Sequence, residues 1–210
     1  MKNFTIKSLC VLFVFSFTCE VYSCTQAKDS SRVTIAGGSL TEITYLLEQE
    51  HKLIAVDITS NYPSVAKELP SIGYVRALSA EGVLSLSPSL ILGEDDMGPT
   101  SVMEQLERVG IQIEIIPEEN TADGIIKKVK CVAEILGVNE DIKNEKLNEL
   151  NLQANNLSIL SSSNKNKSTK VMFILSMESG SPTVGGRDTS ADGLIKMTGA
   201  TNVMDSFEGW

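Results

Sequence analysis

Residues 33–57 read VTIAGGSLTEITYLLEQEHKLIAVD, and this stretch contains the repeating unit that decides the fold. Val33–Ala36 is a short apolar, β-branched run that predicts a strand. Ser39 stands three residues before Glu42, a capping-box spacing that predicts the start of a helix. His51–Asp57 then predicts a second strand. A strand, a helix and a second strand in this order are typical of a parallel sheet with helical crossovers.

The same alternation continues to about residue 120. The next predicted elements are a helix at Ala80–Leu86, a strand at Ser89–Gly93, a helix at Pro99–Val109 and a strand at Ile111–Ile116. Residues 32–120 therefore predict an N-terminal α/β lobe.

A long helical segment follows this lobe. Residues 121–160 are predicted to be mostly helical, with one interruption near Gly137, and apolar residues keep helical spacing from Ile125 to Leu136. A strand and a helix after residue 161 predict the start of a second α/β lobe. The 161–210 segment is too short to cover both faces of a sheet, so we expect a truncated second lobe.

Composition excludes several classes of protein. The chain has 210 residues, 42% of them hydrophobic, and its 27 acidic and 18 basic side chains give a formal charge of -9. The acidic balance argues against nucleic acid as a partner, because proteins that bind it carry basic surfaces. The single histidine, His51, excludes sites built from two or more imidazoles.

The first 23 residues have the layout of a secretory signal peptide, with Lys2 and Lys7 before the apolar run Leu9–Phe17. The segment ends in VYSC (21–24), which resembles a bacterial lipobox. We therefore expect lipidation of Cys24, followed by a polar tether over residues 24–31. A plain signal peptide, with Cys24 an ordinary residue, is the alternative. With Cys24 lipidated, Cys131 has no disulfide partner, and its helical apolar setting predicts a packing role.

The stretch SIGYVRALSAEGVLSL (71–86) carries the most specific candidate chemistry. If residues 73–77 are extended, Tyr74 and Arg76 point to the same side, because side chains alternate along a strand. A guanidinium beside a phenol favours the phenolate, which is a hard ligand for ferric iron and a known axial ligand of haem. Arg76 could instead pair with a carboxylate of a ligand. Chemistry alone favours a packed tyrosine beside an exposed arginine.

Two other polar stretches have plainer explanations. Gly37-Gly38-Ser39 could present backbone N–H groups to an anion, but a tight turn with a capped helix explains it better. Glu94-Asp95-Asp96 follows a buried strand and could hold a hard cation, although a solvated acidic loop is commoner. No nucleophile has a base partner near it in the sequence.

Five segments together resemble a known family. They are AGGSLTEITYLL (36–47), VDITSNYP (56–63), LPSIGYVRALSAEGVLSLSPSLIL (69–92), MGPTSVMEQLERVG (97–110) and GGRDTSADGLIKMTGATNVMDSFEG (185–209). They resemble the haem-binding proteins of bacterial haem ABC importers, within a wider siderophore and cobalamin group. The resemblance implies two Rossmann-like α/β lobes joined by one long rigid helix, with the ligand in the cleft between them.

The resemblance also implies roles for single residues. Tyr74 matches the tyrosine that ligates haem iron, and Arg76 matches a neighbour that bonds this tyrosine or a haem propionate. Glu81 matches a glutamate that docks on the permease, although a carboxylate at a helix start also suits the helix dipole. Tyr62 and Met97 are weaker matches to loops beside the cleft, and either could simply be a packing residue. Arg187 is a weaker match to the cleft wall of the second lobe.

The expected function is that of a substrate-binding protein and not of an enzyme. We expect it to capture ferric haem in the periplasm, anchored by lipid, and to deliver it to an ABC permease with its ATPase. Trp210 replaces a tyrosine common in the family and the chain ends there, which puts haem transfer in doubt. The alternatives are a siderophore or cobalamin carrier of the same fold, a lipid-anchored α/β hydrolase using the acidic loop, or a truncated inactive product.

Overall fold

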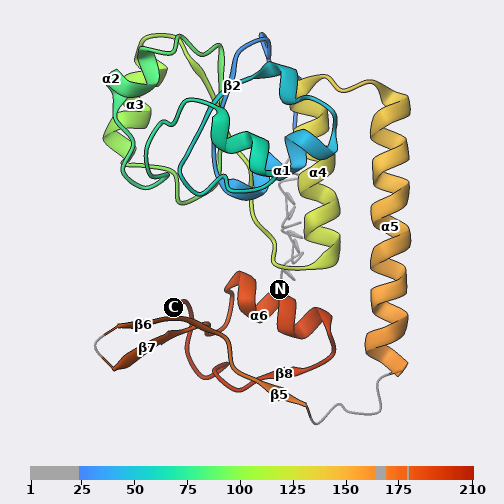
Figure 1. The fold of residues 1–210 in the computed structure, drawn as a ribbon. Coiled ribbons are helices and arrows are strands. Elements are labelled where there is room, and N and C mark those ends of the chain that lie inside the picture. Colours follow the sequence, from blue (N-terminus) through green and yellow to red (C-terminus); the bar gives the residue numbers. More distant parts are fainter. Residues whose placement is uncertain (1–23, 164–168, 179) are drawn as a thin grey trace, which may run out of the picture.

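The computed structural model describes residues 24–163, 169–178 and 180–210, and the predicted signal peptide lies outside these residues. Figure 1 shows a larger α/β unit, a long helix α5 beside it, and a smaller unit that contains the C-terminus. Within the described ranges, no helix is long and apolar enough to cross a membrane.

The larger unit is built on a four-stranded parallel sheet in the order β2-β1-β3-β4. Central strand β1 places Val33 beside Leu53 of β2 on one side and beside Leu90 of β3 on the other. The prediction of a parallel sheet with helical crossovers is therefore confirmed. The strands are β1 (Val33–Ala36), β2 (Leu53–Val56), β3 (Leu90–Gly93) and β4 (Gln112–Ile115).

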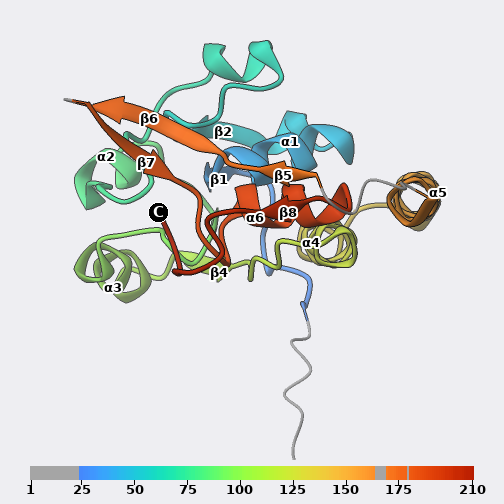
Figure 2. The same ribbon diagram turned by 90° about the horizontal axis from the view of Figure 1, so that it is seen from below.

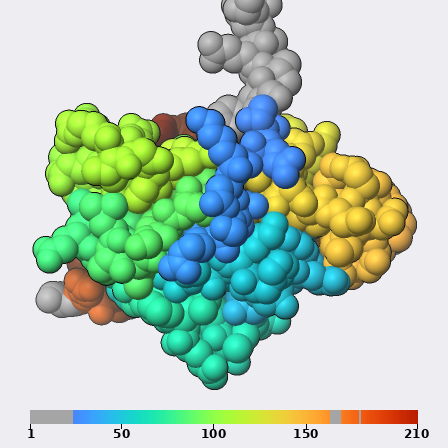
Figure 3. Space-filling model, turned by 90° about the horizontal axis from the view of Figure 1, so that it is seen from above, coloured from blue at the N-terminus to red at the C-terminus, as the bar shows by residue number. Residues whose placement is uncertain are grey.

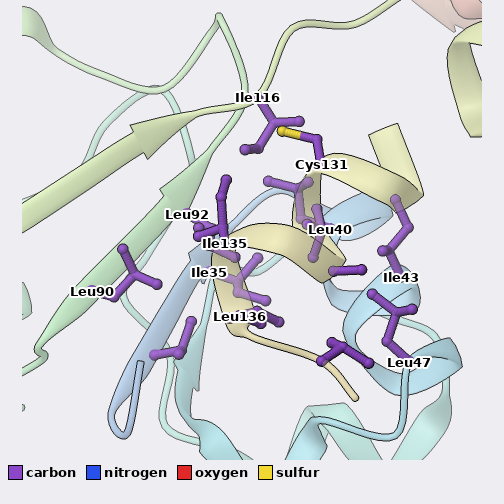
Figure 4. Packing of buried hydrophobic residues seen from close by; sticks show 14 of the residues in the cluster. Ile35, Leu40, Ile43, Leu47, Leu90, Leu92, Ile116, Cys131, Ile135 and Leu136 are labelled. Atoms are coloured by element: carbon purple, nitrogen blue, oxygen red, sulfur yellow. The ribbon is translucent and has the colours of Figure 1, made fainter. Parts of the chain in front are cut away.

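Helices cover both faces of this sheet because successive strand residues point to opposite faces. Leu90 and Leu92 of β3 belong to one apolar cluster, which includes residues of α1 and α4 (Figure 4). Ile91 belongs to a second cluster on the opposite face, with residues of α2 and α3. The helices are α1 (Gly38–Leu46), α2 (Ala80–Leu84), α3 (Thr100–Arg108) and α4 (Ala122–Leu136), with 3-10 turns at Glu50–Lys52 and Ser64–Glu68.

The ends of the helices follow local sequence signals in most cases. The Thr121 side chain accepts a hydrogen bond from the Gly124 N–H and so caps α4, which ends at Gly137 in the left-handed conformation (φ 64°). The predicted capping box of α1 is wrong. This helix begins at Gly38 without a side-chain cap, and the Ser39 hydroxyl donates to Glu94 instead.

Helix α5 (Glu140–Ser163) connects the two units, as the helical segment predicted (Figure 1). The smaller unit contains β5 (Lys170–Val171), β6 (Ile174–Glu178), β7 (Ser181–Val184), α6 (Ser190–Met197) and β8 (Thr201–Asn202). Strands β5 and β8 pair in parallel, and β6 and β7 form an antiparallel hairpin (Figure 2). The sequence predicted one strand where β5 and β6 lie, and it did not predict β7 or β8.

Residues 24–31, predicted to be a free tether, lie against the end of α4. The Ala27 N–H donates to the Ile135 carbonyl at 3.0 Å, and the Ala27 side chain is buried in the first apolar cluster. The Ser30 hydroxyl reaches the Leu136 carbonyl at 3.3 Å. Figure 3 shows the first described residues, in blue, lying across the surface beside the residues of α4. The tether prediction is wrong because this segment completes the packing of α4.

Cys24 and Cys131 form a disulfide, with their Cα atoms 5.2 Å apart. The prediction that Cys131 has no partner is therefore wrong, although its side chain is buried in the core as expected (Figure 4). A sulfur atom in a disulfide cannot also form the thioether to lipid that a lipobox cysteine receives. The predicted lipidation of Cys24 is incompatible with this bond. Because the two residues lie 107 positions apart, only the fold reveals that they meet.

Candidate functional site

The floor of the site lies where the loops after β1 and β3 meet. These two central strands are neighbours whose helical connections leave on opposite sides, and ligands of open α/β sheets bind at the carboxyl ends of such strands. Here the Ser39 hydroxyl, from the first turn of α1, donates to a carboxylate oxygen of Glu94, which follows β3. Gly37 has φ 145° and lies so close to this carboxylate that a Cβ would be only 3.0 Å from it. The sequence needs glycine here so that the two loops can approach.

Helix α4 adds a buried cation to this floor. Lys128 Nζ lies 2.6 Å from the same Glu94 oxygen and 3.4 Å from a Glu118 oxygen. The Lys128 and Glu94 side chains are only 6% and 16% exposed. Each of these shielded charges is stable only beside its partner, because an unpaired charge removed from water is costly. The pair therefore holds α4 against the end of β3.

The acidic loop 94–96 is therefore not one solvated cluster. Glu94 is buried with Lys128, whereas Asp96 extends to the surface and pairs with Arg76. Among the residues that the structure describes, no group of three or more His, Cys, Asp or Glu side chains could hold a metal ion. The hard-cation interpretation of this loop does not fit the geometry.

A buried carboxylate fixes the next loop. The Asp57 side chain accepts hydrogen bonds from the Gly37 N–H at 3.1 Å, the Thr59 N–H at 3.0 Å and the Ser60 hydroxyl at 3.0 Å. These bonds hold the turn after β2 against the turn after β1. Tyr62 lies at the end of this fixed turn and is 68% exposed.

A cavity of about 860 Å³ opens beside this floor, between α1, α4, α5 and α6. Figure 1 shows α6 of the smaller unit lying below α4 of the larger one, so the cavity has walls from both units. Its apolar lining includes Ile43, Val129 and Leu194, and three glutamates, Glu42, Glu118 and Glu119, stand around it with Lys128. Tyr62 lines this cavity, but Tyr74, Arg76, Met97 and Arg187 do not.

Tyr74 lies in a turn and not in an extended segment, so the expected strand geometry of residues 73–77 is wrong. The Ala77 N–H donates to the Tyr74 carbonyl at 2.8 Å, which closes the turn. Its neighbour Val75 is only 5% exposed, whereas Tyr74 is 42% exposed. The turn therefore buries one side chain and presents the phenol to solvent.

Arg76 lies at the surface, where Asp96 and the Tyr74 phenol are its neighbours. Its Nε donates to Asp96 Oδ2 at 2.8 Å. The bond to Asp96 and the charge of Asp96 raise the pKa of Arg76 above its usual value, and the Tyr74 hydroxyl contributes in the same direction. The guanidinium is thus always charged and lies within electrostatic reach of Tyr74. No local pattern predicts the role of Asp96, because 20 positions separate it from Arg76.

The remaining predicted residues are dispersed. Met97 is buried in the second apolar cluster, as the packing alternative for it expects. Arg187 is exposed, and its backbone N–H donates to the Phe207 carbonyl at 2.7 Å in the smaller unit. Glu81 is exposed in the first turn of α2, where a carboxylate suits the helix dipole and is also free to meet a partner.

The comparison with protein families decides what kind of protein this fold and site represent. The model of the "Periplasmic binding protein" family matches residues 33–208. The chain belongs to this family. Its members are binding proteins, so the hydrolase alternative no longer applies.

Solved structures of haem-binding relatives are similar over most of the chain. The periplasmic heme-binding protein RhuT from Roseiflexus sp. RS-1, in apo form, is 29% identical with a TM-score of 0.78, and the match covers 86% of this chain and 69% of that one. The heme-binding protein HutB of Vibrio cholerae is 34% identical with a TM-score of 0.74, covering 86% and 69%.

A curated relative has a different ligand in its name. The vitamin B12-binding protein of Vibrio vulnificus is 34% identical over 109 residues, which are 52% of this chain and 37% of that protein. The chain thus matches little more than a third of this relative's length. The family is established, and its haem-binding and cobalamin-binding members are both similar to this chain.

Proposed function

We propose that the chain is the substrate-binding component of an ABC importer and that it binds ferric haem through the Tyr74 phenolate. The observation that carries this proposal is the exposure of the Tyr74 phenol between buried residues of a fixed turn. A phenolate oxygen is a hard anionic ligand of the kind that holds haem iron in some proteins. The 29–34% identity to haem-binding proteins over 86% of the chain supports the same ligand.

The turn that carries Tyr74 is preorganised for this task. On one side, the Ile58 N–H donates to the Gly73 carbonyl at 2.9 Å. On the other side, Gly98 donates to the Val75 carbonyl and accepts from the Leu78 N–H, both at 2.9 Å. These bonds fix the backbone before ligand arrives, so that little conformational entropy is lost on binding.

Arg76 supplies the positive charge that a phenolate and the haem propionates require. Arg76 Nε donates to Asp96 Oδ2 at 2.8 Å, and this bond restricts the positions that the guanidinium can take. An exposed ion pair of this kind adds little to the stability of the fold, so its role is to orient the guanidinium. The guanidinium is then placed to bond a propionate of the bound haem.

Delivery to a permease completes the proposed role. Glu81 lies exposed at the start of α2 and would meet cationic residues of the permease. Tyr62 and Arg187 are the other exposed side chains that we propose for the ligand side of the protein. The periplasm is the proposed location, since the family and its haem-binding relatives are periplasmic proteins.

Cobalamin is the second candidate ligand, and the curated relatives support it. The two ligands are distinguished by titrating the chain separately with ferric haem and with cyanocobalamin, following absorbance and heat. Saturable haem binding with no response to cyanocobalamin supports the proposal. Saturable binding of cyanocobalamin with only non-specific haem binding would reverse it.

A further inference from the structure

The Cys24–Cys131 disulfide joins the N-terminal segment to the helix that carries Lys128. Cys131 lies in α4 one helical turn after Lys128. Cys24 belongs to the segment 24–31, which packs on the last turn of the same helix. The bond therefore closes a covalent ring that contains the whole parallel sheet.

The segment that this bond holds covers part of the core. Ala27 is buried among the residues that α1, β1 and α4 share, and its N–H donates to the Ile135 carbonyl. Gln26 lies against Gly137, where a Cβ would be 2.4 Å from the Gln26 amide nitrogen. Release of the segment would expose these contacts to water.

Cys24 is the more accessible end of the disulfide, since it is partly exposed whereas Cys131 is buried. Both cysteines line an open cavity of about 370 Å³, together with Lys127, Lys130 and Glu134. A thiol that enters this cavity can attack the bond, since exchange requires access to a sulfur atom. Neighbouring ammonium groups favour the thiolate that attacks or leaves.

We propose that the disulfide between Cys24 and Cys131 is a covalent clasp that holds the segment 24–31 on α4, and that it is an alternative to thioether attachment of a diacylglyceryl group to the Cys24 sulfur. The Cys24 and Cys131 thiols transfer two electrons and two protons to the disulfide of another protein. That disulfide is reduced to a dithiol, and the S–S bond between Cys24 and Cys131 forms. This bond occupies the sulfur that lipid attachment needs. The segment 24–31 of the oxidised chain is consequently held at α4, and the chain is not anchored through Cys24.

The proposal is tested on the full chain, expressed with its leader in a bacterium that processes lipoproteins. Intact mass before and after reduction, with maleimide alkylation at each stage, reports the state of both sulfurs. In the processed chain, from which the leader with Cys10 and Cys19 has been removed, we expect no alkylation before reduction, two alkylated cysteines after it, and a mass that is lower by two hydrogens in the oxidised form. A diacylglyceryl group on Cys24 together with an alkylated Cys131 overturns the proposal.

Hydrogen exchange tests the clasp itself. Reduction should raise the exchange rate of the Ala27 amide at least about tenfold, because its bond to Ile135 depends on a segment that is then free to open. The Cys24→Ser/Cys131→Ser variant is the matched control and should exchange fast with or without reductant. Exchange at Ala27 that is equally slow in oxidised and reduced wild type contradicts a clasp.

Discussion

Replacing Lys128 with methionine removes the only ammonium group that contacts Glu94 among the described residues. Lys128 Nζ and the Glu94 carboxylate are 2.6 Å apart, and both side chains are largely shielded from water. Methionine keeps an unbranched apolar stem of similar length, so packing around α4 should be retained. The substitution therefore measures the cost of leaving Glu94 without its partner charge.

The magnitude follows from the burial of the pair. Two unit charges 2.6 Å apart attract by about 6 kcal/mol at an effective dielectric constant of 20, and desolvation offsets part of this attraction. Removal of one partner from a buried pair costs about 3–5 kcal/mol. We expect about 3 kcal/mol for Lys128→Met, because Glu94 keeps the hydrogen bond from Ser39. In a chain of this size that loss lowers the Tm by roughly 6–12 °C.

Urea and thermal unfolding followed by circular dichroism give the free energies. Lys130→Met is the matched control, because Lys130 lies on the same helix but is 60% exposed and 3.9 Å from Glu134. This control should cost less than about 1 kcal/mol. The double variant Lys128→Met/Glu94→Gln should recover most of the loss, since no charge is then left alone. A Lys128→Met variant as stable as the Lys130→Met control would refute the reasoning.

Three further predictions concern stability. Cys24→Ala should lower the free energy of unfolding by about 4–5 kcal/mol in the chain-entropy model, because the lost disulfide spans 107 positions. A urea midpoint equal to that of oxidised wild type would contradict this. Burial opposes ionisation of Asp192, but bonds from Lys196, Asn202 and a backbone N–H outweigh burial and lower its pKa. Its stabilising effect is complete above the unfolded pKa of about 3.9 and is lost as the pH falls through the lowered folded pKa, so Asp192→Asn should flatten the loss of stability below about pH 4. An acid profile unchanged from that of wild type would contradict this. Lys52→Met should cost about 1 kcal/mol in the same unfolding assay, since Lys52 Nζ donates at 2.5 Å to a carbonyl at the end of α4, and an unchanged midpoint would speak against that role.

The larger unit was predictable from the sequence because its strands and helices are short and clearly separated. Val33–Ala36 and Leu90–Gly93 are apolar runs bounded by glycine, proline or polar residues, which the strand pattern detects. The smaller unit was predicted less well. Strand β6 is mostly exposed and its partner β7 contains Pro182, so neither shows the burial pattern on which such predictions depend.

Of the residues proposed for the ligand, the sequence alone singles out Tyr74, and its role stays a prediction. Tyr74 stood out because a tyrosine and an arginine occur close together in a specific motif. The contacts of Asp96 with Arg76, Glu94 with Lys128 and Cys24 with Cys131 join positions 20, 34 and 107 apart. Such pairs are set by the order of strands and the packing of α4, which no local pattern contains.

The central claim is that the Tyr74 phenolate is a ligand of haem iron. Its most direct test is the absorption and resonance Raman spectrum of the ferric-haem complex of wild type, Tyr74→Phe and Tyr62→Phe. We predict phenolate-to-iron charge transfer in wild type and in Tyr62→Phe, and its loss in Tyr74→Phe with haem affinity at least about tenfold weaker. A Tyr74→Phe complex with the wild-type spectrum and unchanged affinity would contradict the account.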